Sequence, residues 1–139
     1  MKIVYVEWGA FGSEDMRNAF IADKHDLVLF LFSAVYEKRS HDEETEKRLQ
    51  TLLHKETPDV VFSLNYFPVI SRICQQEDIR YISWTYDCPC YLLYSTTILA
   101  PCNVAYVFDK ALYLEFHRAG IQTVHYMPLA ADTQRLDSI

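Results

Sequence analysis

Residues 84–95 read WTYDCPCYLLYS and bring several reactive side chains together in one short stretch. Asp87 offers a carboxylate between the aromatic rings of Trp84 and Tyr86. Such a setting would suit a general base that removes a proton from a substrate. A local turn in which Asp87 bonds its own backbone is an equally good interpretation, and the residues alone leave both open.

The four cysteines of the chain have a spacing that argues against a metal or redox site. A structural zinc site needs four ligands, commonly from paired C-x-x-C segments, and the sequence contains no such segment. Cys88 and Cys90 flank Pro89, which predicts an extended geometry with the two thiols pointing apart. Cys74 falls among the apolar positions of an expected helix, and Cys102 stands alone. We therefore predict no metal site.

A second stretch, residues 7–12 (EWGAFG), holds two of the three glycines. Its G-x-x-G spacing matches neither the dinucleotide fingerprint nor the phosphate loop, so it predicts a tight turn. Trp8 and Phe11 add two aromatic rings to this turn. These rings either pack inside the domain or form a platform for a sugar or ring substrate.

Alternating strand and helix patterns must position these residues. Short apolar runs predict strands at residues 3–6, 26–32, 60–64, 81–84, 104–108 and 124–127. Helices are expected after Ser13 as N-cap, from a capping box at residues 40–43, from Pro68 and after Asp109. Strands that are apolar throughout need cover on both faces. The pattern therefore predicts an α/β, Rossmann-like, doubly wound and mostly parallel sheet of about six strands with helices on both faces.

Length and composition fit one domain of 139 residues, half of them hydrophobic. The net charge of −6 argues against a nucleic-acid partner, which would require a basic face. The longest apolar run is too short to span a membrane. The first strand pattern begins at Lys2 and leaves no room for a signal peptide. We therefore expect a cytoplasmic protein.

Ligands of doubly wound sheets bind beyond the carboxyl ends of the strands, and this rule selects the loops after four strands. Asp87 is the predicted catalytic residue. Asp109 belongs to the same edge, although a helix cap explains it equally well. The predicted substrate contacts are Trp8, Gly9, Phe11, Gly12, Asn65, Tyr66, Trp84, Tyr86, Pro89 and Asp109.

Five segments of the second half form a recurring frame: residues 58–68 (PDVVFSLNYFP), 81–89 (YISWTYDCP), 101–103 (PCN), 107–110 (VFDK) and 128–130 (PLA). Together they resemble the N-terminal domain of the CgeB-like (spore maturation) glycosyltransferases, a domain of unknown function. The first 57 residues match only in their strand, loop and helix order. The W-x-Y-D-x-P pattern contains the tryptophan, tyrosine, aspartate and proline as its frame, with the cysteine positions variable.

This resemblance implies a GT-B architecture, in which two Rossmann-like domains face each other across a cleft. The N-terminal domain usually handles the acceptor, and the C-terminal domain grips the nucleotide-sugar. Residues 1–139 are thus expected to form a single acceptor-side domain, without the donor domain and inactive alone. Its expected partners are its own donor domain and a sugar acceptor. No cofactor is expected here, since the nucleotide-sugar donor would bind the C-terminal domain.

Asp87 would be the general base of an inverting enzyme, or would position the acceptor in a retaining one. The alternative is a non-catalytic Rossmann-like module that binds a small ligand or a protein. The isolated domain is also expected to self-associate through an exposed aromatic patch. That patch would consist of Trp8, Phe11, Tyr66, Tyr86 and Tyr91.

Overall fold

A computed structural model describes residues 1–33 and 43–139. The predicted capping box at residues 40–43 lies outside the described residues except for Glu43. Six strands form one sheet: β1 (Lys2–Glu7), β2 (Asp26–Leu31), β3 (Val60–Leu64), β4 (Arg80–Thr85), β5 (Asn103–Val107) and β6 (Val124–Tyr126). The helices are α1 (Ser13–Ala22), α2 (Glu43–Glu56), α3 (Pro68–Gln76), α4 (Lys110–Arg118) and α5 (Thr133–Asp137), with short 3-10 helices η2 (Tyr91–Tyr94) and η3 (Thr96–Leu99).

The sheet has the strand order β2-β1-β3-β4-β5-β6, and every pairing is parallel. The order reverses at β1, as in a doubly wound fold. The predicted α/β, Rossmann-like class with helices on both faces is therefore confirmed. The six predicted strands all exist, with bounds that differ by one residue or less at most ends.

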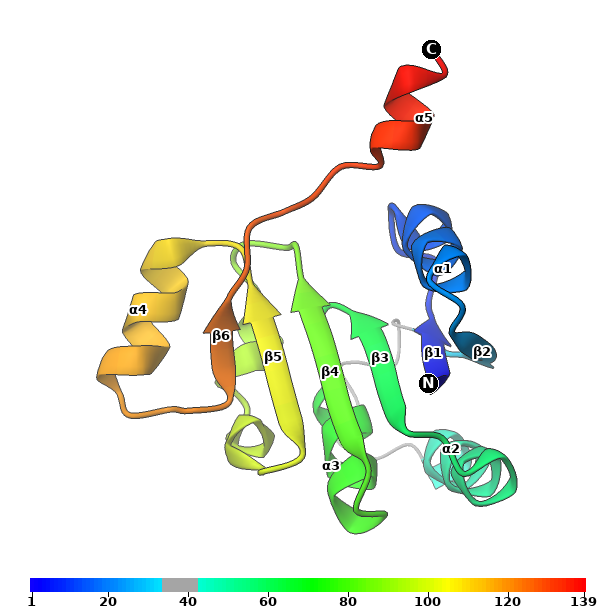
Figure 1. The fold of residues 1–139 in the computed structure, drawn as a ribbon. Coiled ribbons are helices and arrows are strands. Elements are labelled where there is room, and N and C mark those ends of the chain that lie inside the picture. Colours follow the sequence, from blue (N-terminus) through cyan, green and yellow to red (C-terminus); the bar gives the residue numbers. More distant parts are fainter. Residues whose placement is uncertain (34–42) are drawn as a thin grey trace.

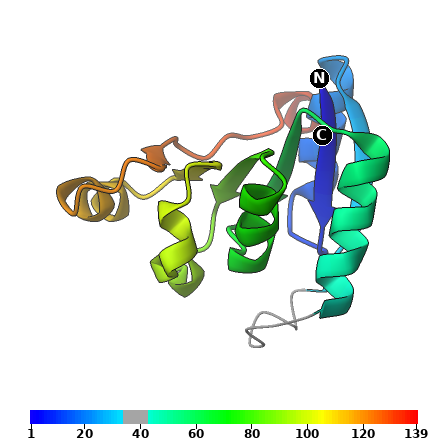
Figure 2. The ribbon, with the colours of Figure 1, turned by 90° about the horizontal axis from the view of Figure 1, so that it is seen from below.

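The two faces of the sheet are covered unequally (Figures 1 and 2). Helices α2, α3 and α4 line one face, and their apolar side chains join one large buried cluster. On the other face α1 packs over β1 and β3, with Met16 and Phe20 against Tyr5 and Phe62. No helix among the described residues lies over β4, β5 and β6 on that side, which faces the viewer in Figure 1.

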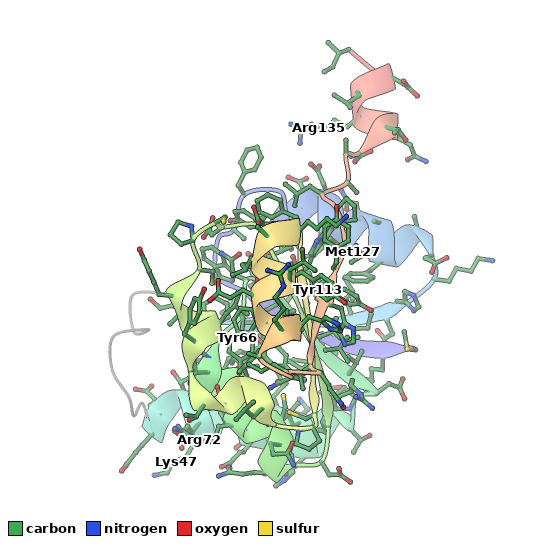
Figure 3. The ribbon with its side chains drawn as sticks, turned by 90° about the vertical axis from the view of Figure 1, so that its left-hand side faces the viewer. Lys47, Tyr66, Arg72, Tyr113, Met127 and Arg135 are labelled. Atoms are coloured by element: carbon green, nitrogen blue, oxygen red, sulfur yellow. The ribbon has the colours of Figure 1, made fainter. Side chains whose placement is uncertain are left out.

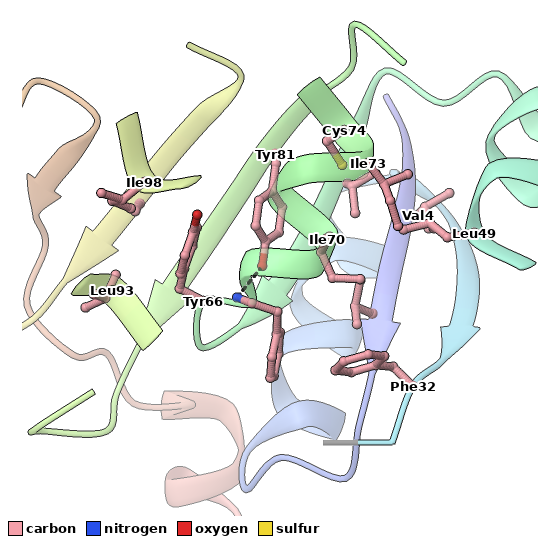
Figure 4. Close-up of a cluster of buried hydrophobic side chains, with 14 of the residues drawn as sticks. Val4, Phe32, Leu49, Tyr66, Ile70, Ile73, Cys74, Tyr81, Leu93 and Ile98 are labelled. Atoms are coloured by element: carbon pink, nitrogen blue, oxygen red, sulfur yellow. Dashed lines mark hydrogen bonds between the residues drawn. The ribbon is translucent and has the colours of Figure 1, made fainter. Parts of the chain in front are cut away.

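The main core lies between the sheet and helices α2, α3 and α4. Leu49 of α2, Ile70 and Ile73 of α3, and Tyr81 of β4 are all buried there, as Figure 4 shows. Pro68 begins α3 at the predicted position, where its missing N–H leaves no intrahelical bond unmade. This cluster fixes the position of β3 and β4, whose ends carry the candidate site.

The last segment leaves β6 and turns back toward α1. Helix α5 extends beyond the sheet (Figures 1 and 3), and Arg135 Nη1 lies 2.7 Å from a carboxylate oxygen of Asp15 on α1. Within the described part of the chain, no helix is long and apolar enough to cross a membrane.

The prediction that Ser13 caps the first helix is wrong. Gly12 is the N-cap, with φ of 78°, and Ser13 is the first helical residue. The Ser13 hydroxyl instead donates to a carboxylate oxygen of Glu7 at 2.6 Å. Glu7 stands at the end of β1, so the hydroxyl ties the strand to the helix that follows it.

Candidate functional site

The carboxyl edge of the sheet joins the loops after β3 and β4 through Asn65. The Asn65 Nδ2 donates to a carboxylate oxygen of Asp87 at 2.7 Å. The backbone N–H groups of Tyr86 and Asp87 both point at Asn65 Oδ1, at 3.1 and 3.4 Å. Three of the predicted site residues, Asn65, Tyr86 and Asp87, are thus brought into direct contact.

Asn65 has a conformation that few side chains tolerate. Its φ is 61°, in the left-handed region where asparagine and glycine are favoured. It is 5% exposed, and its backbone N–H donates to the Trp84 carbonyl at 3.0 Å. Asn65 was predicted to contact substrate, but its side chain is occupied mainly by Tyr86 and Asp87. It therefore acts on the site as a clamp that holds the next loop.

A chain of buried hydrogen bonds connects the backbone of Asn65 to the main core. Ser63 Oγ donates to the Asn65 carbonyl at 2.6 Å, so the Tyr81 hydroxyl donates to Ser63 Oγ, also at 2.6 Å. The Tyr81 oxygen in turn accepts from the Phe67 N–H at 3.1 Å, the bond drawn in Figure 4. Burial raises the pKa of Tyr81 well above its ordinary value, so the phenol stays protonated and able to donate.

Asp87 itself is exposed to solvent, as are Cys88 and Pro89 after it. The apolar enclosure expected around the carboxylate is therefore absent, and its general-base role stays a prediction. Tyr86 is half-buried beside it. Partial burial, and then the nearby Asp87 charge, raise the pKa of Tyr86. The edge thus presents one free carboxylate face next to a protonated phenol.

The loop after β1 is bound to its own surroundings. Trp8 Nε1 donates to the Leu64 carbonyl at 2.7 Å, and its ring packs edge-on against Phe67. Gly9 donates its N–H to Glu7, and Gly9 and Gly12 both have positive φ. Trp8 is thus a partly buried packing residue, whereas Phe11 at the tip is 86% exposed.

Three other predicted contacts lie away from this edge or are occupied. Tyr66 is fully buried and its hydroxyl bonds Thr97, so the side chain is not accessible to a substrate in this structure and its predicted contact stays a prediction. Trp84 lies on the sheet face, among the residues packed beside α1. The Asp109 side chain accepts from the Leu112 N–H at 2.7 Å and caps α4, as its helix-cap interpretation predicts.

The predicted aromatic patch is only partly formed. Phe11 and Tyr91 are exposed, by 86% and 77%, whereas Trp8 and Tyr86 are half-buried and Tyr66 is buried. Self-association through this patch stays a prediction. The exposed aromatic area at the edge is smaller than expected because Trp8 and Tyr66 contribute to the core.

All four cysteines are free thiols. Cys74 and Cys90 are buried and Cys102 is half-buried, and burial raises the pKa of all three thiols. Cys88 is exposed, and the peptide bond before Pro89 is cis. Among the described residues, no group of three or more histidine, cysteine or acidic side chains could hold a metal ion.

Sequence reasoning missed the residues that support the site from within. Ser63 and Tyr81 belong to strands that were read as plain apolar runs. A serine in the middle of β3 (VVFSL) was the one available signal, because a buried hydroxyl needs a partner. The Ser13–Glu7 bond was missed because Ser13 also fits the preferred residue types of a helix cap.

No protein-family model and no curated protein matches the sequence. Among solved structures, the fold is similar to the crystal structure of a LacI-family transcriptional regulator, CCPA from Weissella paramesenteroides, determined with bound glucose. The TM-score is 0.51 at 13% identity, over 86% of this chain. The chain spans 41% of that protein's length. At this identity the similarity shows the fold alone, an α/β Rossmann-like fold.

Proposed function

We propose that this chain is the acceptor-side domain of a glycosyltransferase that uses a nucleotide-sugar donor. The observation that carries the proposal is the Asn65 clamp, which fixes the backbone at Tyr86 and Asp87 and leaves the Asp87 carboxylate exposed. A fixed carboxylate at the carboxyl edge suits the recognition of a sugar hydroxyl. In an inverting enzyme it would remove the hydroxyl proton, and in a retaining enzyme it would orient the acceptor.

The surroundings of Asp87 support a role in binding. Ligands of parallel sheets of this order bind beyond the strand carboxyl ends. Among the described residues, the carboxylates at the ends of β1 and after β5 are occupied: Glu7 bonds Gly9 and Ser13, and Asp109 caps α4. Within the described part of the chain, the Asp87 carboxylate bonds Asn65, and the residue is otherwise exposed to solvent. Holding a reactive group in place before the substrate arrives lowers the entropic part of the barrier.

A non-catalytic module that binds a small ligand or a protein is the second proposal. Two exposed rings favour it, since Phe11 and Tyr91 give the edge apolar contact area without reactive groups. The structural neighbour was crystallised with glucose, which is a property of that protein. For this chain, binding without transfer would need the same edge and no donor site.

Calorimetry with two classes of ligand separates the proposals. Neutral mono- and disaccharides are one class, and nucleotide-sugars such as UDP-glucose and GDP-mannose are the other. An acceptor-side domain should bind a neutral saccharide weakly, with a dissociation constant of about a millimolar. It should neither bind nor turn over the nucleotide-sugars, because transfer requires donor and acceptor to be held together.

Each other result selects against the first proposal. Heat from nucleotide-sugar binding, or hydrolysis of the donor by the chain alone, would contradict an acceptor-side assignment. Binding of neither class up to about ten millimolar, far above the constant expected, would leave the protein-binding module as the better account. Asp87→Asn keeps an acceptor for Asn65 and removes the charge, so it is the matched variant for any binding that is found.

A further inference from the structure

The side of β4, β5 and β6 turned away from α3 and α4 is an apolar surface without a helix over it. We call it the open face, and it consists of Arg80, Ile82, Trp84, Val104, Tyr106 and His125. These residues alternate along their strands with residues of the main core, which places them on the opposite side. Figure 1 shows this side of the three strands unobstructed, and Figure 2 shows the helices below them.

A hollow of about 260 Å³ lies where the open face meets α1. Its lining includes Ile3, Phe20, Phe62, Ile82, Trp84 and Tyr106. Parallel sheets occur almost only with both faces covered, because their strands are apolar on both sides. Apolar surface of this kind on a folded domain marks an interface or a ligand groove. The open face therefore calls for an occupant.

The dimensions of the open face match one α-helix. Neighbouring strands lie about 4.8 Å apart, so the three strands β4 to β6 span about 10 Å, the diameter of a helix with its side chains. The six residues of β4 extend over about 17–20 Å, the length of a helix of about 12 residues. The open face lies beside α1, and α1 already packs over the neighbouring strands β1 and β3 on the same side of the sheet.

One cation and one histidine at the rim of this surface define the partner further. Arg80 stands at the start of β4 and is exposed, and His125 of β6 is exposed beside the Tyr106 ring. Neither forms an ion pair with a described carboxylate, although the whole chain carries a net charge of −6. A helix that runs antiparallel to the strands, as α1 does, would place its C-terminal end near Arg80. The negative end of its dipole would then face a cation.

We propose that the open face binds an amphipathic α-helix of a partner protein, with an apolar stripe toward Trp84 and acidic residues toward Arg80 and His125. This proposal is independent of the function at the carboxyl edge. A second copy would present the same hollow surface, so the two copies would meet hollow to hollow and leave the hollow of each copy unfilled. A small apolar ligand would leave most of the three strands uncovered, since the hollow is below the usual range of about 300–1,000 Å³.

A synthetic peptide of about 15 residues, slightly longer than the face requires, tests the proposal on the intact chain. Its leucines follow i, i+3, i+4 and i+7 spacing, and glutamates flank the leucine stripe. A matched peptide carries lysines in place of the glutamates. The chain has two tryptophans, so two-dimensional NMR shows two indole N–H signals, from Trp84 on the open face and Trp8 outside it.

The glutamate peptide should shift the Trp84 indole signal and leave the Trp8 signal unchanged. The lysine peptide should bind at least about fivefold more weakly, and added salt should reduce the difference. This readout uses the unchanged chain, so it does not depend on a variant that folds. Equal affinity of the two peptides, or no Trp84 shift at millimolar peptide, would overturn the proposal.

Two variants locate the contact. Ile82→Glu places a negative charge in the middle of the open face and should weaken the glutamate peptide at least about tenfold. Leu31→Glu makes the same change at an exposed position of edge strand β2 and should leave the affinity within about twofold. Sedimentation equilibrium without peptide measures whether the chain instead forms a dimer through this face. A dimer that Ile82→Glu abolishes would show that the face pairs with itself, against the proposal.

Discussion

Tyr81 and Trp84 lie three residues apart on β4 and have opposite surroundings. Tyr81 is 1% exposed, and its hydroxyl bonds Ser63 and Phe67 within the main core. Trp84 points to the other face, half-buried, and the described residues offer its indole nitrogen no acceptor. One strand therefore carries a buried phenol with hydrogen-bond partners on its closed face and a half-buried indole without one on its open face, although the Ser83 and Thr85 hydroxyls of the closed face also lack a partner among the described residues.

The difference separates the part of the molecule that holds the fold from the part available for binding. The closed face supplies both the packing and the hydrogen-bond chain that ends at Asn65. The site at the carboxyl edge thus depends on a core residue, Tyr81, that is itself buried away from the surface. Substitutions on the closed face should therefore lower the free energy of unfolding more than substitutions on the open face, which should mainly affect binding.

Truncation of one isoleucine on each face should give the largest contrast. Ile73→Ala removes a fully buried side chain between α3 and the sheet and should lower the free energy of unfolding by about 3 kcal/mol. Ile82→Ala on the open face should lower it by about 1 kcal/mol, because that side chain is already partly hydrated. Urea unfolding measures both. Equal losses would mean that the open face is as well packed as the closed one.

Removal of one phenolic hydroxyl on each face is the next contrast. Tyr81→Phe leaves the buried Phe67 N–H without an acceptor and should cost about 2 kcal/mol. Tyr106→Phe on the open face should change stability by less than about 0.5 kcal/mol. The same urea curves decide the matter. A Tyr81→Phe variant as stable as the parent would show that the hydrogen-bond chain contributes nothing.

The sequence was sufficient to predict the closed face and insufficient for the open one. Apolar runs such as residues 60–64 predict strands, and their alternation with helices predicts the parallel sheet that the structure confirms. The same reasoning predicted helices on both faces and had no means of seeing that α1 covers only part of one. Whether a helix covers a sheet face depends on where the helices lie in space. A strand has the same apolar sequence pattern whether its face is covered or exposed.

The candidate site was predicted in outline only. The rule that ligands bind beyond strand carboxyl ends selected Asn65 and Asp87, which do lie together. It also selected Tyr66 and Trp84, one buried and one on the sheet face. Positions next to one another in a loop point in different directions, and that direction follows from backbone dihedral angles such as the positive φ of Asn65.

Two substitutions of Asn65 test how the closed face supports the edge. Asn65→Gly removes the side-chain bonds but tolerates the φ of 61°, and should cost about 1 kcal/mol. Asn65→Ala adds the strain of the left-handed region and should cost about 1 kcal/mol more. Thermal unfolding measures the pair. If Asn65→Ala were as stable as Asn65→Gly, the backbone at residue 65 would have moved out of the left-handed region, and that conformation would not be what fixes the clamp.

Alkaline titration gives the smallest expected effect and tests the covered part of the second face. Burial under α1 raises the pKa of Tyr5 to about 12. The unfolded chain ionises near pH 10, so the folded state loses stability as the pH rises from about 10 to about 12. At pH 11 the loss from Tyr5 should be about 1 kcal/mol, relative to Tyr5→Phe as control. If Tyr5→Phe lost stability between pH 10 and 12 as steeply as the parent, the pKa of Tyr5 would not be raised by burial.

The most direct test of the central claim is an amide NMR titration of the chain with neutral saccharides. We expect shifts concentrated at Tyr86, Asp87 and Phe11, and we expect Asp87→Asn to weaken saccharide binding about tenfold. Asn65→Gly should weaken it similarly while keeping the Asp87 charge. Shifts that lie elsewhere, or a saccharide affinity that Asp87→Asn leaves unchanged, would contradict the claim that this clamped carboxylate receives a sugar hydroxyl.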